Sequence, residues 1–271
     1  QQILLLRTAL NSTGFSGLQL GRKCQILTNL AGQLNTAGRP VEALEAWGKV
    51  LSMVPKFWMA RGNRGIALMH YALSLYDPGH RDVFLLFAHR DLEVASRFDP
   101  TTLQWGDPAA LQYFREHKRI IERETKLETI EEHFEPMGYA LGRSSAERAY
   151  RAWCLQERLF LNPLNDLDTH TIAAQDVLTL PDFVTSIGVP PVLTGFFNQM
   201  KQEFVSARWE YYLGVTAQHP HFSDRNVLLY NTLDYPAYGL AVERVKGAYK
   251  YAYSLFDKIA FFLSDYLALE I

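Results

Sequence analysis

Residues 231 to 271 carry the most regular hydrophobic pattern in the chain. Apolar side chains recur there at alternating steps of four and three residues, over more than three heptads. These positions are Ala241, Val245, Ala248, Ala252, Leu255, Ile259, Phe262 and Tyr266. Because a helix with one apolar stripe must bury that stripe against a neighbour, the pattern predicts a long helix packed in a bundle.

A second stretch, VLTGFFNQMKQEFVSARWEYYLG, repeats the same alternation and supplies the expected partner helix. Its apolar positions are Leu193, Phe197, Met200, Phe204, Ala207 and Tyr211. We therefore expect the two helices to pair along these stripes. On this prediction the change Ile259→Asp buries an unpaired charge, and it should cost roughly several kcal/mol of stability.

The N-terminal half shows a longer period. TNLAGQL begins at Thr28 and GNRGIAL begins at Gly62, and this separation equals the period of the tetratricopeptide repeat. The closing segments ALEAWGKVLSMVP and AHRDLEVASRFDP align only at a wider separation, with Ala43 matched to Ala88. We therefore expect an insertion in the loop around YDPGHRD. Residues 24 to 103 are interpreted as two such helical hairpins, and residues 1 to 23 as the end of a preceding helix.

Residues 104 to 143 are predicted to bridge the two halves. The segment LQYFREHKRIIERETKLETIEEHF is highly charged, and its apolar positions are too sparse for a deep core. These positions are Leu111, Phe114, Ile121, Leu127, Ile130 and Phe134. After this segment, Ser144 with Glu147 three residues later predicts a capping box. The helix that starts there is expected to continue to Asn162, which precedes a proline.

Amino-acid composition and charge exclude several classes of protein. An apolar content of 48% over 271 residues is enough for real cores, and a net charge of -2 gives no global attraction to nucleic acid. The two cysteines, Cys24 and Cys154, fit buried apolar positions in a reducing compartment better than a disulfide or a metal site. With no signal peptide pattern and no long uncharged apolar window, we predict a cytoplasmic protein that does not contact a membrane.

Sequence motifs of familiar enzymes are missing. The chain has no phosphate-binding Walker loop, no dinucleotide-binding glycine pattern, no HExxH and no GxSxG. His219 and His221 could start a metal site, but no third ligand stands at a diagnostic spacing, so a solvated turn is the favoured interpretation. We therefore expect neither a cofactor nor a metal.

Two groups of residues are candidates for binding. The first is a set of polar residues for which both ligand contact and a structural role in caps and turns stay open. This set is Asn162, Asn165, Asp166, Arg208, Arg225 and Asp234. Within it Arg208 stands beside an apolar stripe and needs a partner, with a salt bridge favoured over a ligand contact. The second group is the predicted partner groove on the concave side of the repeats, which would take a protein or peptide, although a pure packing module is the alternative. Its residues are Thr28, Met59, Ile66 and His70.

Three long strings in residues 144 to 271 resemble one family. ERAYRAWCLQERLFLNPLNDL, GFFNQMKQEFVSARWEYY and HFSDRNVLLYNTLDYPAYGLAVERVKGAYKYAYSLFDKIAFFL resemble bacterial HEPN domains (higher eukaryotes and prokaryotes nucleotide-binding) that follow tetratricopeptide repeats. The resemblance implies a helical bundle and RNA as the partner. Many members are metal-independent ribonucleases of toxin, antiviral or RNA-processing systems. They work as dimers, so a homodimer through this domain is implied, and the polar residues above become candidates for contact with RNA.

The catalytic signature of such ribonucleases is an arginine, then four to six residues, then a histidine, which supply charge stabilisation and acid or base catalysis. The only match in the chain, Arg64 to His70, lies in the second repeat, where this spacing turns the two side chains to different faces of a helix. We interpret it as chance, and residues 144 to 271 lack the motif.

Two interpretations of the missing motif remain open. If the motif lies beyond Ile271, the chain is the inactive front part of an RNA-cleaving toxin or defence effector, which the unfinished apolar stripe favours. Otherwise the bundle is an inactive HEPN scaffold in a protein-interaction adaptor. In either case we expect an all-α protein, with tetratricopeptide hairpins followed by a partial HEPN-like bundle, that does not itself catalyse a reaction.

Overall fold

The computed structural model describes residues 1–98, 106–181, 184, 188, 190–228 and 238–267. Over these residues it contains helices and no strand, which confirms the all-α prediction. The chain divides into two compact units, Gln1–Leu178 and Thr179–Ile271. We describe the units separately as unit 1 and unit 2.

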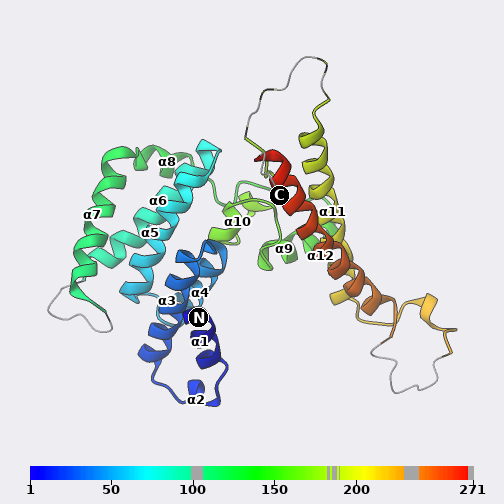
Figure 1. Ribbon diagram of the computed structural model, residues 1–271, viewed down its shortest axis with the longest axis horizontal. Helices are drawn as coiled ribbons and strands as arrows, with labels where there is room; N and C mark the ends of the chain where they lie inside the picture. Colours follow the sequence, from blue (N-terminus) through cyan, green and yellow to red (C-terminus); the bar gives the residue numbers. More distant parts are fainter. Residues whose placement is uncertain (99–105, 182–183, 185–187, 189, 229–237, 268–271) are drawn as a thin grey trace. The chain divides into compact units, whose positions relative to one another are not determined.

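Unit 1 begins with six helices in which successive long helices pack as hairpins (Figure 1). Two of them start with a proline, whose fixed φ angle suits the first turn of a helix. The connections between the helices of each hairpin are short, and α1 packs against α3. The six helices are α1 (Gln2–Leu10), α2 (Thr13–Ser16), α3 (Leu20–Thr36), α4 (Pro40–Met53), α5 (Trp58–Ser74) and α6 (Pro78–Ser96).

The spacing of these hairpins corrects the expected repeat register. Helices α3 and α5 begin at Leu20 and Trp58, and helices α4 and α6 begin at Pro40 and Pro78, so both pairs share one offset. This offset is longer than the tetratricopeptide period. Only residues 75 to 77 connect α5 to α6, so the expected insertion in that loop is wrong. The two unequal alignments matched small and apolar side chains that recur within helices, rather than equivalent positions.

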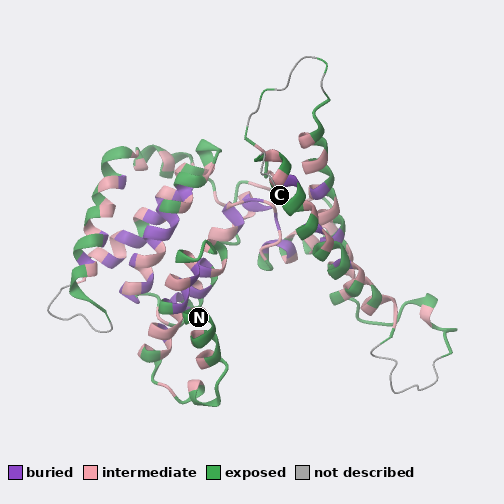
Figure 2. Ribbon diagram, in the orientation of Figure 1, coloured by how far each residue is buried: buried purple, intermediate pink, exposed green. Residues whose placement is uncertain are grey.

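The core of unit 1 lies between these hairpins, where buried side chains line the facing sides of α3 to α6 (Figure 2). Its largest fully buried side chains include Trp47 and Phe84. Cys24 and Cys154 are both fully buried, which confirms their interpretation as small apolar core residues.

The charged segment after α6 is not a surface bridge. It forms α7 (Pro108–Glu124) and α8 (Leu127–His133), and α7 packs against both α5 and α6. Three of its six apolar positions are almost fully buried: Leu111 at 1% exposure, Phe114 at 1% and Ile121 at 2%. Phe114 lies directly on Gly62, where a Cβ atom would stand 2.1 Å from the ring. Sparse apolar residues sufficed because these three side chains are almost fully enclosed by neighbouring helices.

Helix α9 (Ser145–Gln156) begins with the predicted cap, since Ser144 Oγ accepts a hydrogen bond from the backbone N–H of Glu147 at 3.1 Å. The helix ends at Gln156, earlier than the expected end at Asn162, and Arg158 follows with a φ of 55°. The short helices α10 (Leu164–Leu167) and η1 (Thr171–Ala173) come next. All of these elements fall within unit 1, whereas the domain boundary predicted from the sequence lies at residue 144.

Unit 2 contains α11 (Val192–Val215), the short η2 (Phe222–Asp224) and α12 (Leu240–Tyr266). Helices α11 and α12 lie side by side along most of their length, which confirms the predicted pairing (Figure 1). They run antiparallel, because Gly214 meets Val245 at one end and Phe197 meets Phe262 at the other. Their buried residues are Met200, Ala207, Arg208, Ala248, Leu255 and Phe262.

Two residues of the predicted α12 stripe lie outside this interface. Ile259 is 43% exposed and Ala252 is also exposed, so the expectation that Ile259→Asp buries a charge is wrong. A single partner helix covers a narrow seam of α12, and the stripe of small and apolar residues is wider than that seam. None of the described helices is both long and apolar enough to span a membrane.

Candidate functional site

The two asparagines of the predicted polar set hold the turn between α9 and α10. Asn165 is fully buried, its Oδ1 accepts from the N–H of Phe160 at 3.3 Å, and its Nδ2 donates to the carbonyl of Leu155 at 3.1 Å. Asn162 Oδ1 accepts from the N–H of Leu164 at 3.0 Å. These bonds satisfy backbone groups where α9 ends, so both side chains have the structural role that the sequence left open as one alternative.

Asp166 joins the same turn to the hairpin array. Its Oδ2 accepts a hydrogen bond from the Tyr71 hydroxyl of α5 at 2.9 Å, and its backbone carbonyl accepts from Arg158 Nη1 at 2.8 Å. Burial raises the pKa of Asp166, although the Tyr71 bond and the charge of Arg158 act in the opposite direction. Burial also raises the pKa of Tyr71, with the charge of Asp166 as a further cause.

The remaining members of the polar set belong to unit 2 or fall outside the described residues. Arg208 lies on α11 at 5% exposure, with its guanidinium carbon 5.9 Å from the centre of the Phe204 ring. Arg225 is exposed where η2 ends, and Asp234 falls outside the described residues. The described members of the set are therefore divided: Asn162, Asn165 and Asp166 meet at one turn of unit 1, and the two arginines belong to unit 2.

The histidines before η2 lie in a turn, which is the interpretation favoured by their spacing. His221 Nδ1 accepts from the backbone N–H of Ser223 at 3.3 Å and lies 2.8 Å from its hydroxyl, so it caps η2. His219 lies two residues before it, in an exposed stretch.

The predicted partner groove is divided between the core and the surface. Thr28 is 2% exposed and Ile66 is 9% exposed, so both pack inside the hairpin array and neither can contact a partner. Met59 is partly buried against Gly106, and only His70 is exposed. The difference arises because the repeat register assumed from the sequence placed buried positions on the concave side.

Arg64, the arginine of the chance motif, is committed to a buried ion pair. Its Nε and Nη2 donate to the two carboxylate oxygens of Asp91 at 2.5 and 2.9 Å, and Arg61 Nη1 donates to Asp91 Oδ1 at 2.6 Å. Asp91 is 1% exposed. A guanidinium held by a buried carboxylate is poorly placed to stabilise charge on a substrate, which agrees with the interpretation of Arg64 and His70 as chance.

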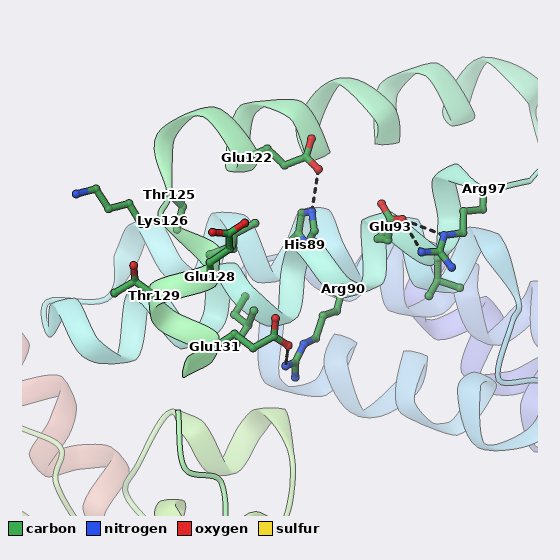
Figure 3. A pocket seen from close by; sticks show the side chains of 13 residues that line it. His89, Arg90, Glu93, Arg97, Glu122, Thr125, Lys126, Glu128, Thr129 and Glu131 are labelled. Carbon is green, nitrogen blue, oxygen red and sulfur yellow. Dashed lines mark hydrogen bonds and ion pairs between the residues drawn. The ribbon is translucent and has the colours of Figure 1, made fainter. Parts of the chain in front are cut away.

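One cavity among the described residues was not predicted from the sequence. It has a volume of about 1030 Å³ and lies between α6, the end of α7 and α8 (Figure 3). Its walls are mostly charged, and Figure 3 shows His89 joined to Glu122, and Arg90 to Glu131. The lining residues are Leu86, His89, Arg90, Glu93, Val94, Arg97, Glu122, Thr125, Lys126, Leu127, Glu128, Thr129 and Glu131.

Three of these residues have the donor atoms of a metal site, because ligand atoms of His89, Glu93 and Glu122 lie within 4.8 Å of one another. However, Lys118 Nζ lies 2.8 Å from a carboxylate oxygen of each glutamate, and Arg97 Nη2 lies 2.7 Å from Glu93, so two positive charges already face the two carboxylates. Hydrogen bonds from Lys118 lower the pKa of both glutamates, and hydrogen bonds to Glu122 and Glu93 raise the pKa of Lys118. The cluster is therefore an ion-pair network that joins α6 to α7.

Comparison with known proteins adds one finding. The family model described as LA2681-like HEPN matches residues 184–271. No curated protein and no solved structure shows a significant match to the chain. The matched range includes both helices of the antiparallel pair, α11 and α12.

Proposed function

We propose that this protein acts on RNA, from the premise that residues 184–271 form a HEPN-family domain. Such a domain suggests a HEPN-type nuclease or toxin family. The observation that carries the proposal is that the family match covers α11 and α12, the two helices that pack as one antiparallel pair. The specific role proposed is in an RNA-cleaving toxin or defence effector.

Within this role, residues 184–271 bind RNA but do not cut it. The matched range contains three arginines, Arg208, Arg225 and Arg244, and none is followed by a histidine after four to six residues. Arg208 is also buried in the helix interface. Without a histidine beside an arginine, proton transfer at a ribose hydroxyl and stabilisation of phosphate charge are not brought together.

Unit 1 supplies the partner-recruiting part of the proposal. Its successive helical hairpins resemble tetratricopeptide repeats in their order, although the offset from Pro40 to Pro78 is longer than the usual period. Stacked hairpins of this kind present extended surfaces for protein or peptide partners. A homodimer formed through the HEPN-family domain completes the proposed assembly.

The test combines binding and cleavage of RNA by the purified 271-residue chain. Fluorescence anisotropy with labelled RNA measures binding, and a denaturing gel run after incubation in chelator measures cleavage. We expect saturable binding and intact RNA. Cleavage in chelator would contradict the assignment of binding without catalysis. If the chain neither binds nor cuts RNA, the RNA role fails and a protein-interaction scaffold becomes the better explanation.

A further inference from the structure

The outer side of α12 carries exposed aromatic rings at helical spacing. Tyr249 is 68% exposed, Tyr253 is 62% exposed and Phe256 is 71% exposed. Because these residues are four and three positions apart, they line one side of the helix. The rings of Tyr249 and Tyr253 stack with centroids 6.2 Å apart and an angle of 28° between their planes. We call Tyr249, Tyr253 and Phe256 the ring stripe.

Two lysines accompany the ring stripe. Lys246 precedes Tyr249 by three residues and pairs with Glu243 at 2.7 Å. Lys250 follows Tyr249 directly and is exposed. Hydrogen bonding to Lys246 and, as a smaller cause, the charge of Lys250 lower the pKa of Glu243. The first part of the stripe thus carries two positive charges against the one of Glu243, while Asp257 stands at its far end.

These charges decide what kind of molecule fits the surface. An apolar protein surface laid over the stripe would remove from water the excess positive charge of Lys246 and Lys250 over Glu243, which is costly. Phosphate groups would instead neutralise it, and unpaired bases would stack on the tyrosine rings. In contrast, a base-paired duplex hides its base faces and could use only the lysines.

We propose that the ring stripe of α12 is a stacking platform for unpaired bases of single-stranded RNA, with Lys250 contacting the backbone. This inference rests on the proposed RNA-binding function and adds the class of substrate and the surface that binds it. The bases contact aromatic faces, so the platform tolerates different sequences but requires unpaired nucleotides.

Residue Tyr251 provides a matched control. It lies on the same helix, is 53% exposed and is the same residue type, but a step of two residues places it on the opposite side of the helix from Tyr249 and Tyr253. Replacing any of these tyrosines removes little buried surface, so the variants should keep their fold, as circular dichroism would verify.

The experiment measures anisotropy of a short fluorescein-labelled single strand and of the same strand in a duplex. We expect the unchanged chain to prefer the single strand. Tyr249→Ala with Tyr253→Ala should weaken binding at least about 20-fold, because each stacked base contributes roughly 5- to 150-fold. The double change to Phe should retain binding because the ring faces remain. Tyr251→Ala should leave the affinity within about twofold.

Each other outcome has a separate meaning. If the unchanged chain binds RNA and the double alanine variant binds equally well, the stacking platform is wrong and the proposed function stands. If the double variant instead changes the sedimentation coefficient from dimer to monomer, the stripe is an interface between copies and the platform is also wrong. If the unchanged chain binds no RNA, the platform falls together with the proposed function.

Discussion

The α5–α6 pair of unit 1 and the α11–α12 pair of unit 2 use the same local device. In each, one glycine lets the helices approach closely: a Cβ atom on Gly65 would lie 3.0 Å from the Ala88 carbonyl oxygen, and one on Gly214 would lie 2.8 Å from the Ala241 carbonyl oxygen. Both pairs are antiparallel and long. They differ in what covers their other faces.

In unit 1, neighbouring helices bury the remaining faces of the pair. Helix α7 packs on both α5 and α6, and α4 packs on α5. In unit 2, the described residues leave large apolar side chains of α12 exposed, such as Phe256 at 71% and Phe261 at 67%. The comparison shows that an apolar stripe specifies a partner helix, whereas burial of the other faces of the two helices depends on how many elements surround the pair.

The largest expected effect comes from emptying the core of unit 1. Phe84 is fully buried and packs edge-on against Tyr71, with ring centroids 4.7 Å apart. Phe84→Ala should cost about 3–5 kcal/mol, because both the buried area and a cavity contribute. The matched change Phe256→Ala on α12 should stay within about 0.5 kcal/mol. Urea denaturation measures both, and equal losses would remove the distinction between the two pairs.

A smaller effect is expected from the ion pairs of the two units. Asp91→Ala leaves the partly buried Arg61 and Arg64 without their carboxylate and should cost about 3 kcal/mol. In unit 2, Lys258 pairs with Glu203 at 2.5 Å in a more exposed position, and Lys258→Met should cost about 1 kcal/mol or less. Thermal unfolding measures both variants. A larger loss of stability for Lys258→Met than for Asp91→Ala would contradict the prediction that the ion pairs of unit 1 contribute more.

Within unit 2, the position of the seam can be tested directly. Leu255 is 7% exposed in the α11–α12 interface, so Leu255→Ala should cost about 2 kcal/mol. Ile259→Ala should cost about 1 kcal/mol or less, because that side chain is 43% exposed. Helix content followed during urea denaturation measures both variants. A larger loss for Ile259→Ala would show that the seam runs along the other side of the stripe.

The smallest effects concern pH, and the two units should respond with opposite signs. Burial raises the pKa of Asp166 above its ordinary value of 3.8. The protonated carboxyl therefore favours the folded state of unit 1, and this stabilisation is lost as the pH rises through the folded-state pKa. Asp166→Asn keeps an oxygen for the Tyr71 hydroxyl. The variant should therefore be slightly more stable than the unchanged chain at neutral pH, and the difference should vanish below 3.8.

Glu203 behaves in the opposite way. Hydrogen bonding to Lys258 lowers its pKa below the ordinary value of 4.5, so its contribution is present above 4.5 and is lost as the pH falls through the folded-state pKa. Glu203→Gln should be slightly less stable than the unchanged chain at neutral pH and equal to it in acid. A series of melting temperatures over pH checks both carboxylates, and the same sign for both would contradict the prediction.

Local patterns predicted much of the fold. The alternation of apolar residues predicted the pairing of α11 with α12, and Ser144 with Glu147 predicted the start of α9. These features depend on neighbours a few positions apart, which the sequence displays directly. The prolines that begin α4 and α6 mark the true offset of the hairpins, but alignment of small side chains obscured it.

Features that depend on tertiary contacts were not predictable in the same way. The burial of Phe114 requires Gly62 from another helix, and the cavity beside α8 depends on how three helices meet. Among the candidate residues, Asn162 and Asn165 matched the structural alternative, whereas Thr28 and Ile66 were placed on a groove although they are buried. A periodic pattern gives the face of a helix, but only the packed array decides which face is covered.

The packing of the Phe114 ring against Gly62 also affects which substitutions this protein can accept during evolution. Every amino acid other than glycine carries a Cβ atom, which at this position would stand 2.1 Å from the ring. Each missense change in the Gly62 codon therefore meets the same obstacle, whatever residue results. Replacement of this glycine therefore requires the Phe114 ring to shift or a smaller side chain to stand at position 114, so we expect substitutions at the two positions to be linked.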